Sequence, residues 1–237
     1  MCAFFDHLYP YCDTILSLDG DEIAATATLL PCQIVQPNSD IQDALYLYSL
    51  TTLPTFRGRG HAQRLLDAAR EKSPRVFLHA ADDSLFDMYA ARGWRGMMYT
   101  RWEELPAEPA HLSIQRLRGE DYLKARENLL QSTAHVRWDT NALQFLDDLL
   151  FFGNGGLFAS QNAIAAVLSK EDNDCLYIAE ALGDDALALA RALAHAHDCP
   201  RAKVLTPCLP EAPGAFPYAQ GVGLPIPDPM YLSFVFL

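Results

Sequence analysis

A short basic run rich in glycine, Arg57-Gly58-Arg59-Gly60-His61-Ala62, has the residue types best suited to chemistry. Glycines let a backbone turn tightly and present its N–H groups, and the two arginines add positive charge. Directly before a helix, such a turn suits an anion, because the first helical N–H groups have no intrahelical partner and the helix dipole favours negative charge. The run therefore predicts a site for a phosphate or pyrophosphate, the alternative being an exposed turn without a ligand.

The residues on either side of this run predict the strand and the helix that would position it. Residues 43–53 are rich in β-branched and aromatic side chains and contain neither Gly nor Pro, which favours a strand. Between residues 61 and 72, apolar side chains recur at helical spacing from Ala62 to Ala69. The spacing of the glycines fits neither a dinucleotide-binding fingerprint nor a Walker A loop, because no Gly-Lys-Ser/Thr follows.

The pattern Arg-x-x-Gly-x-Ala after a strand resembles the pyrophosphate loop of the GCN5-related N-acetyltransferases, the GNAT family. The resemblance implies that backbone N–H groups of this loop hold the pyrophosphate of acetyl-CoA, the co-substrate. It also implies that the end of the preceding strand contacts the thioester and the pantetheine arm, mainly through its backbone. The implied cofactor-binding residues are Leu50, Thr51, Thr52, Leu53, Arg57, Gly58, Arg59, Gly60, His61 and Ala62.

A second motif follows a short apolar strand predicted at residues 75–79. Residues 85–94 predict a helix that one of residues 82–84 caps, and the helix carries Tyr-x-x-x-Gly-aromatic, which resembles the second signature of the same family. By this resemblance, Tyr89 protonates the departing thiolate and is the catalytic residue. The alternative is a core tyrosine on an amphipathic helix. The resemblance covers residues 13–103.

The sequence does not identify the base that an amine acceptor requires. An alkylamine has a pKa near 10.4 and must lose a proton before it attacks a thioester. Many family members carry a Glu on the strand before the glycine loop, but this strand has Asp43 at its start and Tyr46 and Tyr48 within it. The C-terminal carboxylate of Leu237 is an outside candidate.

Length and composition set the class of protein. The chain has 237 residues, of which 50% are hydrophobic, enough for one large or two small domains with a sizeable core. The formal net charge of −12 disfavours nucleic acid and anionic membranes and suits a cationic acceptor. No apolar run approaches the ~20 residues of a membrane span, and the N-terminus lacks the features of a signal peptide.

The six cysteines include no C-x-x-C pair and are expected to be buried, reduced thiols. We therefore expect a cytoplasmic protein, for which a homodimer is one option. His195, His197 and Cys199 could suggest a metal, but His197 would point away from the other two on a helix. The interpretation we prefer is a helix C-terminus, where histidine suits the dipole, and we expect no metal.

The chain also contains a faint internal repeat. Residues 103–111 hold two prolines and no apolar period, and they predict a linker. The order hairpin, strand, helix, strand in residues 13–78 recurs in residues 157–205. Between these, helices are predicted at residues 119–131 and 139–152. The remainder is predicted as a proline-rich irregular stretch at residues 207–229 and a final buried strand at residues 231–237.

The second copy lacks the basic glycine loop. Its turn before the helix contains Asp184 and Asp185, which would repel a pyrophosphate. The arrangement resembles a tandem acetyltransferase of the enhanced-intracellular-survival type, whose aminoglycoside activity is not transferred because this chain is too short for that type's third domain. We expect an acetyl-CoA-binding GNAT domain at residues 1–104 and a degenerate GNAT-like lobe at residues 112–237 that contributes to the acceptor pocket. Glu180 and Trp138 are candidate pocket residues, with a structural role as the alternative.

These observations predict an α/β (mixed α+β) fold of the GNAT-like acyl-CoA N-acyltransferase type, a mixed sheet flanked by helices. The predicted activity is acetyl-CoA-dependent N-acetyl transfer to a primary amine of a small molecule or peptide, by direct attack. The alternatives are a non-catalytic CoA-binding regulatory module and an aminoacyl-transferase of the tandem-GNAT type. The charge and the intact loop argue against the aminoacyl-transferase.

Overall fold

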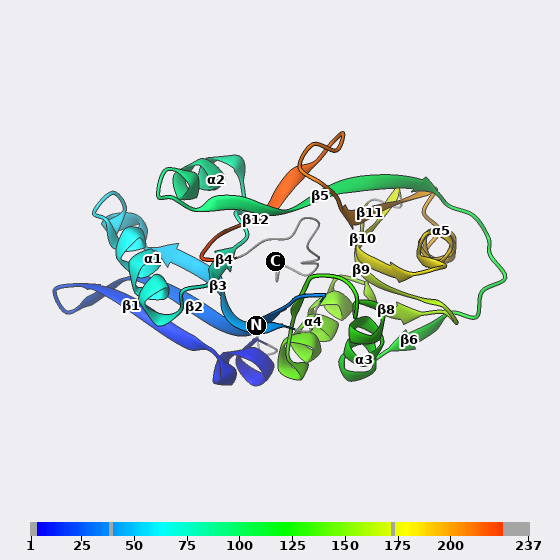
Figure 1. Cartoon of the computed structure of the whole chain (residues 1–237), viewed down its shortest axis with the longest axis horizontal. Helices are drawn as coiled ribbons and strands as arrows, with labels where there is room; N and C mark the ends of the chain where they lie inside the picture. Colours follow the sequence, from blue (N-terminus) through cyan, green and yellow to red (C-terminus); the bar gives the residue numbers. More distant parts are fainter. Residues whose placement is uncertain (1–3, 38–39, 172–173, 225–237) are drawn as a thin grey trace.

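The computed structural model describes residues 4–37, 40–171 and 174–224. The first half begins with two short helical turns and continues with a long hairpin, a third strand and alternating helices and strands (Figure 1). Its elements are η1 (Phe4–Leu8), η2 (Tyr9–Tyr11), β1 (Asp13–Asp19), β2 (Glu22–Val35), β3 (Ile41–Thr52), η3 (Pro54–Phe56), α1 (His61–Lys72), β4 (Val76–Leu78), α2 (Asp83–Ala90) and β5 (Arg95–Pro106).

The second half repeats the hairpin, strand, helix and strand in the predicted order, after two helices that lie close to their predicted ranges. Its elements are β6 (Gln115–Leu117), α3 (Gly119–Leu129), β7 (His135–Arg137), α4 (Thr140–Phe152), β8 (Gly156–Ala159), β9 (Ala163–Glu171), β10 (Cys175–Gly183), α5 (Ala186–Ala196), β11 (Arg201–Pro207) and β12 (Phe216–Val222). The final strand predicted at residues 231–237 and the candidate carboxylate of Leu237 lie outside the described residues.

The strands of both halves form one mixed sheet, in the order β1-β2-β3-β4-β12-β5-β11-β10-β9-β8-β6, with β7 paired to β2. The pairs β3–β4 and β10–β11 are parallel, and the other pairs are antiparallel. The predicted fold class, a mixed sheet flanked by helices, is therefore confirmed.

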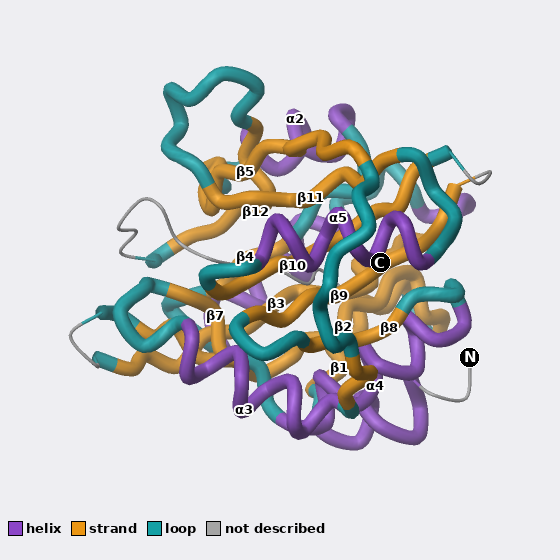
Figure 2. Tube along the Cα trace, turned by 90° about the vertical axis from the view of Figure 1, so that its right-hand side faces the viewer, coloured by secondary structure: helices purple, strands orange, loops and turns teal. Residues whose placement is uncertain are grey.

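Three buried clusters hold the helices to the sheet. Leu65 and Leu66 of α1 pack against small residues of β2 on one face of the first half. In the second half, α5 packs in the same way over β9, β10 and β11 (Figure 2). The largest cluster lies between the halves, where Trp138 and residues of α3 and α4 meet Tyr46 and Phe77 of the first half.

None of the helices in the described ranges combines the length and apolar character that a bilayer crossing requires.

Two predicted segments were wrong. Residues 103–106 belong to β5, a strand that pairs with both β11 and β12 and runs across both halves (Figure 1). Within residues 103–106 only Leu105 is buried, so this end of the strand shows little alternation of apolar and polar side chains. The stretch 207–229, predicted as irregular, contains β12, which has a proline at its second position. Strand β12 lies between β4 and β5, so the predicted ranges 1–104 and 112–237 do not correspond to two separate sheets.

Candidate active site

The glycine run forms an open turn at the start of α1. Gly58 and Gly60 have φ values of +77° and +82°, a region that side chains other than glycine rarely adopt. Gly60 is the N-cap residue and no side chain caps the helix, whose first intrahelical bond runs from Arg64 N to Gly60 O. The N–H groups of the first helical residues, 61–63, therefore have no intrahelical acceptor. This is the anion-binding geometry that the sequence predicted.

A cavity of about 730 Å³ opens in front of this turn. It lies between the end of β3, the turn, the first residues of α1 and one side of α2. Nine of the eleven predicted site residues line it, including Tyr89, whereas Leu53 and Arg59 do not. The lining residues are Leu50, Thr51, Thr52, Phe56, Arg57, Gly58, Gly60, His61, Ala62, Gln63, Asp82, Ser84, Leu85, Met88, Tyr89 and Arg92.

The side chains of two predicted cofactor-binding residues, Arg59 and His61, do not point into the cavity. Arg59 turns away from the cavity: its Nη1 lies 2.8 Å from Asp19 Oδ2, and its guanidinium carbon lies 5.3 Å from the centre of the Phe56 ring. The His61 side chain is buried, with Nδ1 2.9 Å from Ser17 Oγ. His61 can therefore offer its backbone N–H to a ligand, while its ring anchors the start of α1 to β1.

A bulge in β3 shapes the inner end of the cavity. The pairing of β3 with β2 shifts between Thr51 and Tyr48, and Ser49 within this shift has a φ of +55°. Bulges of this kind bend a strand and re-aim its side chains. Strand β3 pairs with β4 only at Leu45↔Val76 and Tyr46↔Phe77, and beyond these positions the two strands diverge. Strand β3 therefore separates from β4 before it reaches the glycine turn.

The gap between the diverging strands holds a second cavity of about 350 Å³. It shares Leu50, Leu85 and Tyr89 with the first, so the two form a continuous cleft from the glycine turn to the end of β4. The second cavity is lined by Tyr46, Leu47, Tyr48, Ser49, Leu50, Leu78, His79, Ala81, Leu85 and Tyr89.

Tyr89 stands where the two cavities meet. It lies on α2, which the Asp82 side chain caps by accepting from Leu85 N at 2.9 Å. Burial raises the pKa of Tyr89, an effect that nearby Arg92 partly offsets. The Tyr89 hydroxyl makes no hydrogen bond with any described residue, so it is a neutral donor that a ligand in the cleft could use.

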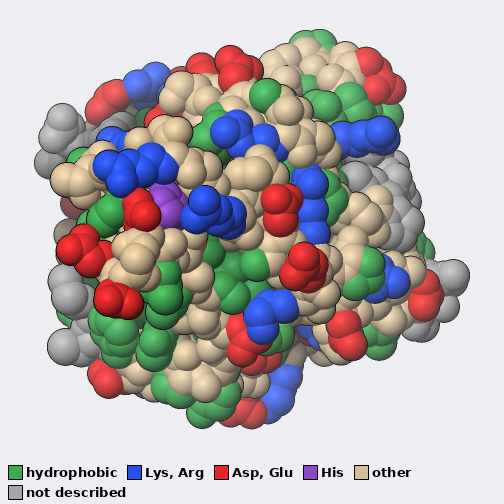
Figure 3. Space-filling view, turned by 90° about the vertical axis from the view of Figure 1, so that its left-hand side faces the viewer, with side chains coloured by type: hydrophobic (Ala, Val, Ile, Leu, Met, Phe, Trp, Pro, Cys, Tyr) green, Lys and Arg blue, Asp and Glu red, His purple; other side chains and the backbone are tan. Residues whose placement is uncertain are grey.

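Sequence reasoning missed two residues of the cleft. Arg92 lines the larger cavity near the C-terminal end of α2, with Nη1 2.7 Å from Met88 O, and supplies a second cation besides Arg57. His79 follows β4 and lines the smaller cavity. Arg92 lies within the quoted Tyr-x-x-x-Gly-aromatic motif, where helical spacing from Tyr89 could have indicated it. Figure 3 looks onto this end of the molecule and shows Lys and Arg side chains across its upper half, despite the overall negative charge.

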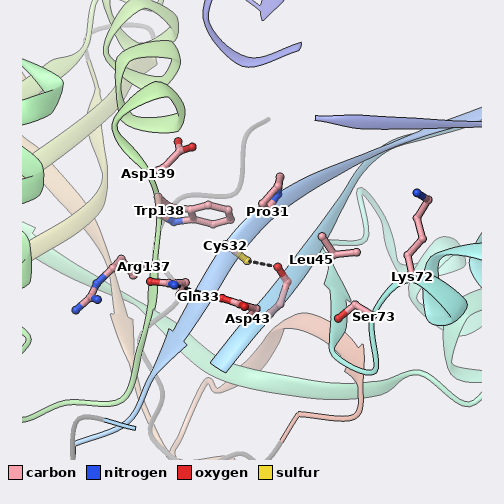
Figure 4. A pocket seen from close by; sticks show the side chains of 11 residues that line it. Pro31, Cys32, Gln33, Asp43, Leu45, Lys72, Ser73, Arg137, Trp138 and Asp139 are labelled. Atoms are coloured by element: carbon pink, nitrogen blue, oxygen red, sulfur yellow. Dashed lines mark hydrogen bonds between the residues drawn. The ribbon is translucent and has the colours of Figure 1, made fainter. Parts of the chain in front are cut away.

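A separate cavity of about 610 Å³ lies between the far ends of β2 and β3, the last turn of α1 and the start of α4 (Figure 4). Trp138 lines it beside Cys32 and Pro31, although its side chain is almost completely buried in the largest core cluster, so its proposed place in an acceptor pocket stays a prediction. The charged side chains around it already have partners. Lys72 pairs with Asp13, Arg137 with Glu127, Asp139 caps α4, and Asp43 accepts from Gln33. This cavity contains neither the glycine turn nor Tyr89.

Glu180 is a structural residue, the alternative that the sequence left open. It is completely buried, with Oε2 3.0 Å from Arg126 Nε and Oε1 2.8 Å from the Tyr122 hydroxyl. His195 lies in the last turn of α5 and His197 caps it, which confirms the predicted helix end. Among the described residues, no three His, Cys, Asp or Glu side chains are grouped so that they could hold a metal ion.

Comparisons with known proteins show what the fold and its first half are similar to. Residues 1–97 match the family model described as "Acetyltransferase (GNAT) domain". The resemblance seen in the sequence is therefore confirmed for this part of the chain. No curated protein matches the chain.

Several solved structures share the fold over most of this chain. A probable N-acyltransferase of unknown function from Enterococcus faecalis has 13% identity and a TM-score of 0.66, covering 92% of this chain and 64% of that one. A GCN5-related N-acetyltransferase from Anabaena variabilis has 12% identity and a TM-score of 0.67, covering 93% and 64%. Eis1 from Mycobacterium abscessus has 11% identity and a TM-score of 0.61, covering 88% and 63%.

At these identities the likeness concerns the fold alone. The chain spans less than two thirds of the length of each of these structures. The degenerate character of the second half stays a prediction.

Proposed function

We propose that this protein is an acetyl-CoA-dependent N-acetyltransferase that moves an acetyl group to a primary amine of a small molecule or peptide by direct attack. The observation that supports the proposal most strongly is the continuous cleft from the glycine turn to Tyr89. Its outer part offers backbone N–H groups and two arginines, which suit a pyrophosphate. Its inner part is a narrow gap between diverging strands, which suits a pantetheine arm and a thioester.

Acetyl-CoA would lie with its diphosphate at the turn formed by residues 58–62 and its arm along residues 50–52. Arg57 and Arg92 flank this outer cavity and would balance the diphosphate charge. The bulge at Ser49 changes the direction of the backbone N–H and C=O groups at the strand end, where the thioester carbonyl would sit. Tyr89 would then face the sulfur, because it borders both cavities.

The proton transfer proposed for Tyr89 requires little free energy. Full proton transfer from an ordinary phenol to a thiolate is uphill by about 2 kcal/mol, from pKa values near 10 and 8.5. Burial raises the pKa of Tyr89 and makes full transfer less favourable still. A hydrogen bond that strengthens as charge builds on the sulfur is therefore the help that Tyr89 can give at the transition state.

The test is acetyl-CoA consumption against polyamines, aminoglycosides, amino acids and peptides, followed by Tyr89→Phe with the best acceptor. We expect kcat to fall about 10–100-fold in this variant, as for the loss of one transition-state hydrogen bond. The CoA dissociation constant, measured by calorimetry, should stay within about twofold of the original protein, because the phenol contributes mainly after the thioester bond weakens. Tyr11→Phe, at an exposed tyrosine outside the cleft, is the matched control. An unchanged kcat in Tyr89→Phe would remove the acid role.

A non-catalytic CoA-binding module is the second candidate function, and one observation favours it. Strand β3 carries no carboxylate near the cleft, since its acidic residue, Asp43, lines the separate cavity. Calorimetric binding of CoA without turnover of any amine in the panel would support this module over the enzyme. An aminoacyl-transferase remains the least favoured alternative, because the formal charge of −12 disfavours a tRNA substrate.

A further inference from the structure

The histidine at the end of β4 has the surroundings of a proton acceptor. His79 is partly buried and lines the smaller cavity together with Tyr46, Tyr48 and Tyr89. Its backbone position is fixed by β4, whose last residues pair with β12 through Leu78↔Gln220. His79 thus lies across the diverging strands from the β3 bulge, at the inner end of the cleft.

A backbone carbonyl determines which ring nitrogen of His79 carries the proton. His79 Nδ1 lies 2.6 Å from Tyr218 O, and because a carbonyl oxygen only accepts, Nδ1 must be the protonated nitrogen. In the neutral ring the lone pair is then on Nε2, which makes no hydrogen bond with any described residue. The Tyr218 ring, 4.9 Å from the imidazole, further limits how the ring can turn.

We propose that His79 is the general base of the transfer and that its Nε2 takes the proton from the attacking amine. The inference rests on the proposed function. As the amine lone pair bonds to the acetyl carbon, the carbon–sulfur bond breaks and the amine proton moves to Nε2. The imidazolium then releases this proton to solvent, and the thiolate, held by the Tyr89 hydroxyl, takes one proton from solvent. No electrons are gained or lost, and the site returns to its starting state.

The surroundings keep His79 neutral in the pH range where an acetyltransferase would work. Burial lowers the pKa of His79, and the hydrogen bond to Tyr218 only partly offsets this. The titratable groups that face it from β3, α2 and β12 are the phenols of Tyr46, Tyr48, Tyr89 and Tyr218, and no carboxylate is among the described residues that line this cavity. Burial raises the pKa of Tyr46, Tyr48 and Tyr89, so these phenols stay neutral near pH 7.

His79→Asn tests the proposal with little change in packing, because the Asn side-chain N–H₂ can still donate to Tyr218 O. With the best amine of the panel, we expect kcat to fall about 10²–10⁴-fold, the usual contribution of a general base. The dissociation constant for CoA should change less than about twofold, because His79 lies outside the larger cavity. His195→Asn, at an exposed histidine on α5, is the control that should leave kcat unchanged.

The pH profile separates a base from a structural residue. The kcat of the original protein should decline below an apparent pKa under 6.5, because protonation of Nε2 removes the acceptor. In His79→Asn this acid limb should be absent, and the residual rate should rise with pH as more amine is unprotonated. Nitrogen NMR of the original protein should show Nδ1–H and a bare Nε2 at pH 7.

The outcomes distinguish the two claims. If the original protein acetylates an amine but His79→Asn keeps its rate and acid limb, the assignment of His79 is overturned and the enzyme stands. A ring protonated at Nε2 at pH 7 would overturn the assignment as well. If the original protein binds CoA and acetylates no amine, the proposed function fails, and the role of His79 fails with it.

Discussion

The two halves of the molecule contain the same strand–helix passage, built in opposite ways. From β3 to α1 the chain uses residues 53–60, a loop with two arginines and two glycines of positive φ. From β10 to α5 it uses only Asp184 and Asp185, and Asp185 Oδ2 accepts from Asn162 at 3.0 Å. The first connection leaves the helix N-terminus open and adds basic side chains. The second connection is short and places two acidic side chains before the helix. The difference shows that strand order alone does not determine whether the N-terminus of the following helix is left open.

The parallel strand pairs of the two halves, β3–β4 and β10–β11, also differ in how far they stay paired. Strand β3 pairs with β4 at two positions, and Tyr48, two residues beyond the last pair, lines the cleft. Strand β10 pairs with β11 at four positions, the last being Ile178↔Val204. Two residues beyond Ile178 is Glu180, which is completely buried against Arg126. The space that forms a cleft in one half is therefore filled by an ion pair in the other.

The largest effect that follows from this comparison concerns the buried pair. Arg126→Met should cost about 3–5 kcal/mol of the free energy of unfolding, because it leaves the Glu180 carboxylate buried without its counter-charge. Arg126 Nη1 also donates to Val136 O at 2.9 Å, and that bond is lost as well. Urea unfolding at pH 7 measures the change. The double variant Arg126→Met/Glu180→Leu should recover most of the loss, since two apolar groups replace the pair.

A matched control lies on the same helix. Lys124 pairs with Glu120 on the exposed face of α3, and Lys124→Met should leave the urea midpoint almost unchanged. If Arg126→Met also left the midpoint unchanged, the second half would not depend on this pair. Its difference from the open first half would then need another explanation.

The sequence predicted those elements of the fold whose periodicity is local. Helix α1 has the predicted range because its apolar side chains recur at helical spacing. Asp82 caps α2, as predicted for one of residues 82–84, and Asp139, the first residue of the predicted range, is the cap of α4. Strand β12 was missed because its pairing with β4 and β5 is remote in sequence and because Pro217 within it is typical of a loop.

For the cleft, the sequence predicted most of the residues that line the glycine turn and missed residues whose placement depends on tertiary contacts. The glycine turn could be found because positive φ and helix N-termini are encoded locally. His79 could not, since its tautomer depends on a carbonyl of Tyr218 more than a hundred residues away. The sequence did not single out Arg126, because nothing in its own segment indicates the buried Glu180. The roles assigned to the predicted ligands stay predictions.

The second prediction compares one glycine from each strand–helix connection, Gly60 and Gly183. Gly60→Ala should weaken CoA binding about tenfold and cost about 1 kcal/mol in stability, because alanine disfavours a φ of +82° and would reorient the first helical N–H groups. Gly183→Ala at the end of β10 should cost more stability, about 2 kcal/mol or more, because its Cβ would lie 2.1 Å from Asn162 O at a φ of +103°. Calorimetry with CoA and urea unfolding measure both variants.

Gly60→Ala should therefore affect mainly the affinity for CoA, whereas Gly183→Ala should affect mainly the stability. We expect Gly183→Ala to bind CoA with unchanged affinity per folded molecule, since its turn lacks the open basic N-terminus. Equal weakening of CoA binding by both variants would mean that the second passage also takes part in binding. The contrast between the halves would then be wrong.

The smallest effect distinguishes two arginines within the first passage. Arg57 lines the cavity, whereas Arg59 pairs with Asp19 and lies over Phe56. Arg57→Gln should weaken CoA binding about threefold to tenfold and reduce its dependence on salt, since it removes one cation near the diphosphate. Arg59→Gln, the matched control, should change the dissociation constant less than about twofold. The charge of the protein changes equally in the two variants, so a difference between them cannot come from net charge. If Arg59→Gln had the larger effect, the ion pair between Arg59 and Asp19 would have to break when the cofactor binds. The glycine turn would then change its conformation on binding instead of being preformed.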